Sequence, residues 1–339
     1  MEEQKDYQTL DFIRIVASFF VVLVHVHLPI PHAYYTMAWA RFAVPVFYMI
    51  NGFFLFRGTS SKEDRLKMIR KTLLKISRIT LFTILFYVIS NSAVCLINGQ
   101  HPLYWLYSQF SLKILKELIL YNHTDFLSHV VWYLLAYIYV LLILYLLTKF
   151  NLVRRVWFLI PFLITVNILH GEVIKLEWFY QGNWLITALP FILIGIYIRE
   201  NPEFYKNLSL PVLWILVLGG SAITFVESLL NYGQVLYLGT IATALGLFLM
   251  GIRAKLVWPQ KISAVGRKLT IYIFIVHCSV RDFLYCIFGI PNELVVYLYP
   301  LIVFVFAAMT GYLIYQFNTL IQRAIDKRKK TLSEVSSEK

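Results

Sequence analysis

The 339-residue chain has little charge and little cysteine. Charged residues form 14% of it, against about 25% in a typical soluble domain, which excludes an ordinary soluble enzyme and a disordered protein. The three cysteines, Cys95, Cys278 and Cys286, lie in apolar segments without a CxxC spacing, so neither a disulfide framework nor a cysteine-rich metal or redox site is expected. The sequence also lacks a P-loop, a dinucleotide-binding glycine motif and a G-x-S-x-G elbow, which argues against ATPase and serine-hydrolase chemistry.

Long apolar segments dominate what is present. Hydrophobic residues make up 59% of the chain, and a membrane-spanning helix needs about 20 consecutive, mainly apolar residues. Ten segments meet this description: 10–29, 38–56, 72–97, 128–148, 156–170, 184–199, 210–230, 234–252, 269–288 and 294–317. The sequence therefore predicts an all-α, polytopic integral membrane protein with about ten transmembrane helices and both termini on one side.

The distribution of basic residues predicts which side that is. With both termini in the cytoplasm, 25 of the 31 lysines and arginines fall on the cytoplasmic side, as the positive-inside rule requires. The net charge of +13 then needs no nucleic-acid partner. We predict a multi-pass protein of the cytoplasmic (plasma) membrane, with a membrane domain over 1–320 and a mobile, basic cytoplasmic tail over 321–339. In the outer segment 98–127, the stretch 103–120 predicts one interfacial amphipathic helix.

Two ionisable side chains in the first predicted span share one face. Arg14 and His25 are 11 residues apart, about three helical turns plus 20°, so they lie on one stripe roughly 16 Å apart along the axis. Ionisable residues cost a few kcal/mol inside a bilayer, so each needs a partner or a task. The alternatives are that Arg14 is a helix-end arginine paired with Asp11, and that His25 is a hydrogen-bonded core histidine.

Polar residues recur in three other spans. The second span has Pro45, where we expect a kink, and an Asn51–Gly52 pair near its inner end that suits helix packing or a ligand. The fourth span begins with His129, Trp132 and Tyr133, an arrangement also typical of an aromatic belt. The ninth carries His277, Ser279, Arg281 and Asp282, with Glu227 as a candidate salt-bridge partner for Arg281.

The eight histidines give no evidence of a metal site. No HxxxH pair with supporting carboxylates occurs, and His25 and His27 point apart on a helix. We therefore predict no metal.

Taken together, these residues resemble the acyltransferase-3 family of polytopic membrane proteins. The resemblance lies in the stretch 10–17 with the Arg14-x10-His25 spacing, and in the stretch 47–55 around Asn51. It continues with Lys75 and Arg78 at the entry to the third span. It ends with the His129-x2-Trp132-Tyr133 stretch and with 269–272 leading to His277.

The resemblance implies an enzyme that moves an acyl group, most often acetyl or succinyl, from cytoplasmic acyl-CoA to a hydroxyl of an extracytoplasmic cell-envelope glycan or lipid-linked sugar. Acyl-CoA would be a co-substrate, with no permanently bound cofactor. Arg14, Lys75 and Arg78 would bind its phosphates. His25 would be the general base, because an unperturbed imidazole titrates near pH 6.5, and His277 would assist it. The expected substrate-binding residues are Asn51, His129, Trp132, Tyr133, Ser279 and Arg281.

Two further expectations follow from the resemblance. Many members of the family carry a fused extracytoplasmic esterase-like domain, whereas this chain is expected to stand alone and either acylate its acceptor directly or pass the group to a separate extracytoplasmic transferase. The stretch 43–48 is also similar to a transporter-like branch of related membrane domains, so transport of a small solute such as an amino acid, or export of a polysaccharide, is the competing hypothesis.

Overall fold

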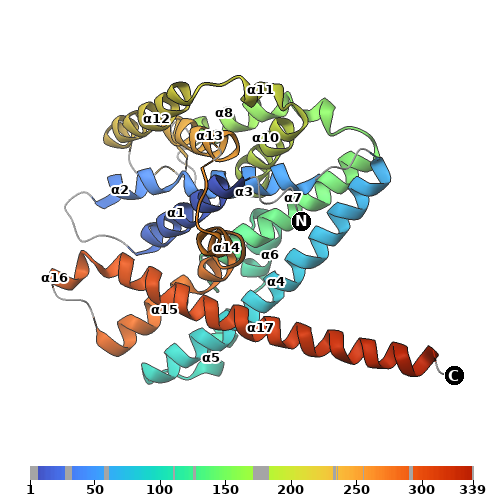
Figure 1. Ribbon diagram of the computed structural model, residues 1–339. Helices are drawn as coiled ribbons and strands as arrows, with labels where there is room; N and C mark the ends of the chain where they lie inside the picture. The colour runs from blue at the N-terminus through green and yellow to red at the C-terminus, as the bar shows by residue number, and fades with distance from the viewer. Residues whose placement is uncertain are drawn as a thin grey trace.

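The protein folds as a bundle of helices in a computed structural model (Figure 1). The structure describes residues 7–26, 33–56, 61–109, 111–124, 127–170, 183–231, 234, 236–254, 256–289 and 293–337. Within these ranges every regular element is helical and there is no strand, so the predicted all-α class is confirmed. The α-helices are α1 (Gln8–His25), α2 (Ala33–Ala40), α3 (Ala43–Leu55), α4 (Lys62–Ile97), α5 (Pro102–Ser108), α6 (Leu112–Tyr121), α7 (Val131–Lys149), α8 (Leu159–Leu169), α10 (Leu189–Glu200), α11 (Glu203–Lys206), α12 (Leu210–Leu230), α13 (Leu238–Arg253), α14 (Gln260–Lys268), α15 (Thr270–Phe288), α16 (Glu293–Val296) and α17 (Tyr299–Ser337). A 3-10 turn (Arg154–Val156) and a π turn (Trp184–Ala188) complete the regular structure of this part of the chain.

Seven helical segments of the described residues are long and apolar enough to cross a membrane, which confirms a polytopic membrane protein. They are α1, the segment Met37–Leu55, α4, α7, α12, α15 and α17. The other three predicted spans coincide with α8, α10 and α13, which have 11, 12 and 16 residues and are shorter than the ~20 residues of an average span. The total of ten spans and the cytoplasmic location of both termini stay predictions.

The helices differ in how much of their surface is covered by protein. In α4, α12 and α17, 28%, 28% and 22% of the most apolar window is buried, against 67% in Met37–Leu55. Apolar side chains such as Leu81, Ile215 and Leu313 are exposed on these peripheral helices, as expected where a helix faces lipid. α1 lies deeper, in contact with α3, α13, α14 and α15.

The crossing of α3 and α10 depends on two glycines. A Cβ at Gly52 would lie 2.1 Å from the carbonyl oxygen of Ile192, and a Cβ at Gly195 would lie 2.1 Å from that of Met49. Only residues without a side chain allow the two backbones to approach this closely. Of the two roles that the sequence allowed for Gly52, helix packing or access to a ligand, the structure therefore shows helix packing.

The expected kink at Pro45 is wrong. The interruption lies at Arg41–Phe42, between α2 and α3, so Pro45 falls in the first turn of α3. A first-turn amide has no intrahelical acceptor, which is why proline is tolerated there.

The single helix predicted over 103–120 is also wrong, because two short helices, α5 and α6, occupy this stretch, and their location at the membrane interface stays a prediction. Ser111 adopts an extended conformation and its side chain accepts a hydrogen bond from the Ile114 amide at 3.1 Å, which starts α6 as a separate helix. Asn122 ends α6 in the left-handed conformation.

Three pairs of helices pack along each other. α4 and α7 run side by side, as do α12 and α13, and α15 and α17 (Figure 1). The end of α17 projects from the bundle in this view. The boundary predicted at residue 320 falls inside α17, and the division into membrane domain and tail stays a prediction.

Candidate active site

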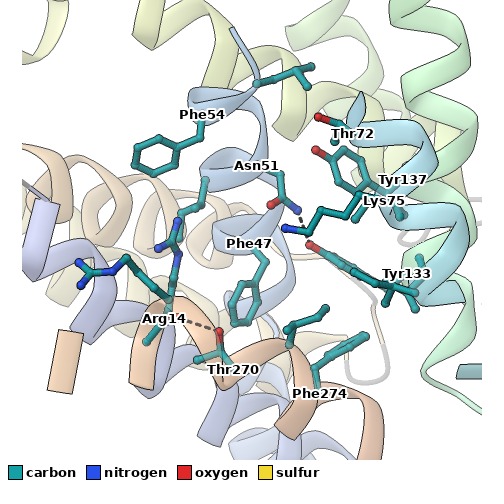
Figure 2. Close-up of a pocket in the computed structure, with 18 residues that line it drawn as sticks. Arg14, Phe47, Asn51, Phe54, Thr72, Lys75, Tyr133, Tyr137, Thr270 and Phe274 are labelled. Atoms are coloured by element: carbon teal, nitrogen blue, oxygen red, sulfur yellow. Dashed lines mark hydrogen bonds between the residues drawn. The ribbon is translucent and has the colours of Figure 1, made fainter. Parts of the chain in front are cut away.

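Side chains from six helices surround a cavity of about 330 Å³ (Figure 2). The walls come from α1, α3, α4, α7, α14 and α15, which are distant in sequence. The lining combines three cations with amide, hydroxyl and aromatic groups. Its residues are Arg14, Phe47, Ile50, Asn51, Phe54, Leu55, Thr72, Lys75, Ile76, Ile79, Tyr133, Leu134, Tyr137, Gly266, Arg267, Thr270, Ile271 and Phe274.

Asp11 holds two arginines at the wall of this cavity. Its Oδ1 accepts from Arg14 Nη1 and its Oδ2 accepts from Arg267 Nη1, both at 2.6 Å. The Arg14 guanidinium also lies 5.4 Å from the centroid of the Phe54 ring. The expected Asp11–Arg14 pair therefore exists, and it does not exclude a binding role, because the pairing orients an arginine that lines the cavity.

Arg267 was not predicted as a site residue. It sits in a basic stretch that the positive-inside rule already explains, so its charge alone carried no specific signal. The neighbouring Gly266 explains its position, since a Cβ there would lie 2.0 Å from the carbonyl oxygen of Asp11. The glycine lets α14 touch α1, and that contact brings Arg267 to the carboxylate.

Of the two basic residues predicted on the third span, the cavity includes one. Lys75 lines it from α4, opposite Arg14, and reaches toward Asn51 and Tyr133 (Figure 2). Arg78 is exposed and is not among the lining residues. A role for Arg78 in donor binding stays a prediction.

Asn51 and Tyr133, both predicted to bind substrate, meet in the cavity. Asn51 Nδ2 donates to the Tyr133 hydroxyl at 2.9 Å (Figure 2). Tyr133 is buried and its ring stacks on Tyr48 with centroids 4.4 Å apart. The cavity thus has a rigid polar wall opposite its arginines.

The two predicted catalytic histidines lie next to each other beyond Phe274. The ring centroids of His25 and His277 are 5.1 Å apart, and that of His129 lies 6.0 Å from His25. His277 is fully buried, His25 is half-buried and His129 is exposed, so the three imidazoles lead from the surface to the interior. His277 Nδ1 donates to the Phe274 carbonyl at 2.7 Å, which leaves the ring's lone pair on Nε2.

Three other residues predicted to bind substrate are hydrogen-bonded to protein groups near the histidines. Trp132 is half-buried and its carbonyl accepts from Asn122 Nδ2 at 2.7 Å. The buried Ser279 hydroxyl is hydrogen-bonded to Ser90 on α4. Arg281 Nη1 donates to the His25 carbonyl at 2.9 Å, so it holds the end of α1 that carries His25.

The proposed Arg281–Glu227 salt bridge is wrong. Arg281 is paired instead with the adjacent Asp282, with Nε 2.8 Å from Oδ1. Glu227 accepts from the amides of Leu238 and Gly239 at 3.1 and 2.8 Å. It therefore caps the positive end of α13, a favourable place for a carboxylate.

The charges of the site suit an anion, because three cations line it, and the nearby imidazoles of His25 and His277 can accept protons. Among the described residues that line the cavity none is acidic, and Asp11 behind Arg14 and Arg267 offsets one of the three positive charges. Phe274 lines the cavity and lies beside His277, with ring centroids 6.1 Å apart.

Comparisons with known proteins bear on the chemistry. No curated protein and no solved structure matches the chain. The family model described as an acyltransferase domain matches residues 7–316. The matched range includes all the cavity-lining residues and the three histidines, and the chain belongs to the acyltransferase-3 family of membrane enzymes.

Proposed function

We propose that this membrane acyltransferase moves an acetyl or succinyl group from cytoplasmic acyl-CoA to a hydroxyl of an extracytoplasmic cell-envelope glycan or lipid-linked sugar, at the plasma membrane. The observation that carries the proposal is the cavity lined by Arg14, Lys75 and Arg267, whose lining also includes Phe274, one helical turn from His277 in the His277–His25 pair. A binding surface for phosphates and a base for the acceptor are thus adjacent.

The cations suit the donor. Coenzyme A carries several phosphate charges, and a guanidinium binds phosphate through paired N–H groups. A volume of about 330 Å³ lies at the lower end of the ~300–1,000 Å³ found for small-molecule sites. This size fits the flexible arm of acyl-CoA, with the nucleotide at the basic entrance.

His25 is the proposed general base. Its imidazole takes the proton of the acceptor hydroxyl while the hydroxyl oxygen attacks the thioester carbonyl. The C–S bond then breaks, and the imidazolium returns the proton to the departing sulfur, which restores neutral His25 and free CoA. The single proton of the hydroxyl goes to His25, so His277 assists in another way. Its Nε2 is an acceptor paired with the Cys278 thiol at 3.4 Å, which does not suit donating to an oxyanion, and its ring packs beside His25 and positions it.

The experiment supplies purified protein with radiolabelled acetyl-CoA or succinyl-CoA and a cell-envelope glycan extract, and measures release of free CoA together with label in the glycan. The proposal predicts both. Reconstituted vesicles are tested in parallel for uptake of amino acids. Solute uptake without any acyl-CoA binding or consumption would support the transport hypothesis instead. Label transfer that needs an added extracytoplasmic protein would identify a partner transferase.

A further inference from the structure

His25, His277 and Cys278 form a cluster of potential metal ligands. One ring nitrogen of each histidine and the Cys278 sulfur all lie within 4.8 Å of one another. No sequence motif indicates this cluster, because His25 belongs to α1 whereas His277 and Cys278 belong to α15. The contact between α1 and α15 creates it.

The orientation of His277 matches that of a metal ligand. Its Nδ1–H donates to the Phe274 carbonyl, and metal-binding histidines almost always fix their second nitrogen in this way. Nε2, which carries the lone pair, lies 3.4 Å from Cys278 Sγ. Zinc bonds of ~2.0–2.1 Å to nitrogen and ~2.3 Å to sulfur at a tetrahedral angle place those two atoms about 3.5 Å apart. Two donors of the cluster therefore already have the spacing that Zn²⁺ requires.

The cluster has one partly exposed member. His25 is half-buried, and its ring lies nearly parallel to that of the exposed His129, with 20° between the ring planes. Arg281, whose charge would oppose a cation, is bonded to Asp282 and thereby offset. Nitrogen and thiolate donors with one exposed side are typical of zinc sites that keep a fourth position for water.

We propose that His25, His277 and Cys278 bind one Zn²⁺ ion and that this ion reversibly inhibits the enzyme. Bond formation between Zn²⁺ and Sγ releases the Cys278 thiol proton to solvent. Zinc-bound His25 has its lone pair engaged, so it does not accept a proton from the acceptor. The inhibitory part rests on the proposed function, whereas the binding of zinc does not.

The binding test uses the full-length protein, purified in detergent and stripped with a chelator. Zinc is added, and the bound metal is measured by mass spectrometry and its affinity by calorimetry. We expect one Zn²⁺ per chain, and a thiolate charge-transfer band when Co²⁺ replaces Zn²⁺. Cys278→Ser should weaken zinc at least tenfold and abolish the band. Cys95→Ser, which alters another buried cysteine on α4, should leave both unchanged. Equal zinc affinity in the wild type and Cys278→Ser would overturn the site.

The activity test measures acyl transfer with and without zinc. Cys278→Ser should retain transfer in chelator and resist a zinc concentration that inhibits the wild type and Cys95→Ser. If Cys278→Ser aggregates on gel filtration, Cys278→Ala replaces it, because alanine buries no hydroxyl. Zinc that binds without inhibiting the wild type would overturn the regulatory role. A preparation that transfers no acyl group at all would count against the proposed function, and zinc stoichiometry would still decide the site.

Discussion

The imidazole of His25 on α1 lies 5.1 Å, centroid to centroid, from the buried imidazole of His277 on α15. Arg281, one turn further along α15, donates to the His25 carbonyl. α15 therefore both faces the His25 ring and holds its backbone. Chemistry that depends on His25 should respond to changes on α15 that leave the cation-lined cavity intact.

Arg281→Gln tests this coupling. The substitution removes a charged donor from the His25 carbonyl, a bond of the class worth about 1.5–3 kcal/mol. We expect kcat to fall roughly tenfold while KM for acyl-CoA stays unchanged, since Arg281 does not line the cavity. Steady-state kinetics with varied acyl-CoA give both constants. Asp282→Asn, which leaves Arg281 in place, is the control, and a KM effect as large as the kcat effect would contradict the positioning role.

Arg267→Ala and Arg14→Ala test donor binding. Each removes a guanidinium from the cavity wall, and the loss of one charged phosphate contact, about 1.5–3 kcal/mol, corresponds to a roughly 10- to 150-fold rise in the Kd of CoA. Calorimetry measures that constant directly.

Arg78→Ala tests whether the phosphates of CoA bind in the cavity or along the exposed face of α4. It should change the Kd of CoA less than about threefold, because Arg78 is exposed outside the cavity lining. An effect equal to that of Arg14→Ala would place the phosphate site along α4 rather than in the cavity.

Gly266→Ala tests the contact between α14 and α1. The new Cβ would lie 2.0 Å from the Asp11 carbonyl oxygen, and an overpacked site of this kind costs about 1–3 kcal/mol. We expect a lower Tm in detergent and weaker CoA binding, since Arg267 moves with α14. Gly219→Ala is the matched control, because nothing lies within 4 Å of a Cβ there. Equal Tm values for the two variants would show that the close contact is not needed.

Asn51 and Tyr133 are tested as a pair. Their 2.9 Å hydrogen bond predicts a coupling of about 0.5–1.5 kcal/mol in a cycle of Asn51→Ala, Tyr133→Phe and the double variant. The quantity measured is kcat/KM for acyl-CoA. Strictly additive effects would mean that the two residues act separately.

Much of the fold was predictable because each membrane span can be recognised from its own length and apolar composition, without knowledge of its neighbours. The positions of the long apolar helices follow from bilayer thickness, and all ten predicted spans coincide with helices. Helix boundaries that depend on a single capping residue were not predicted. Ser111, for example, is the N-cap of α6 and divides the expected outer helix into α5 and α6.

Site residues were predictable where they lie on one helix at a spacing that places them on the same face. Arg14 and His25 share a stripe of α1, so periodicity identified them. Arg267 and Cys278 depend on contacts between helices distant in sequence, through Gly266 and the α1–α15 packing. A single sequence contains no direct signal of such contacts, so these two residues emerged only from the three-dimensional arrangement.

The central claim is that His25 activates the acceptor hydroxyl, and His25→Ala tests it most directly. The measurement is acyl transfer to the glycan, with CoA affinity and gel-filtration behaviour recorded for the same preparation. We predict a loss of about 10²- to 10⁴-fold in kcat, the usual contribution of a general base, with Kd for CoA unchanged because the cavity cations remain. Transfer at the wild-type rate by a folded His25→Ala variant would contradict the account.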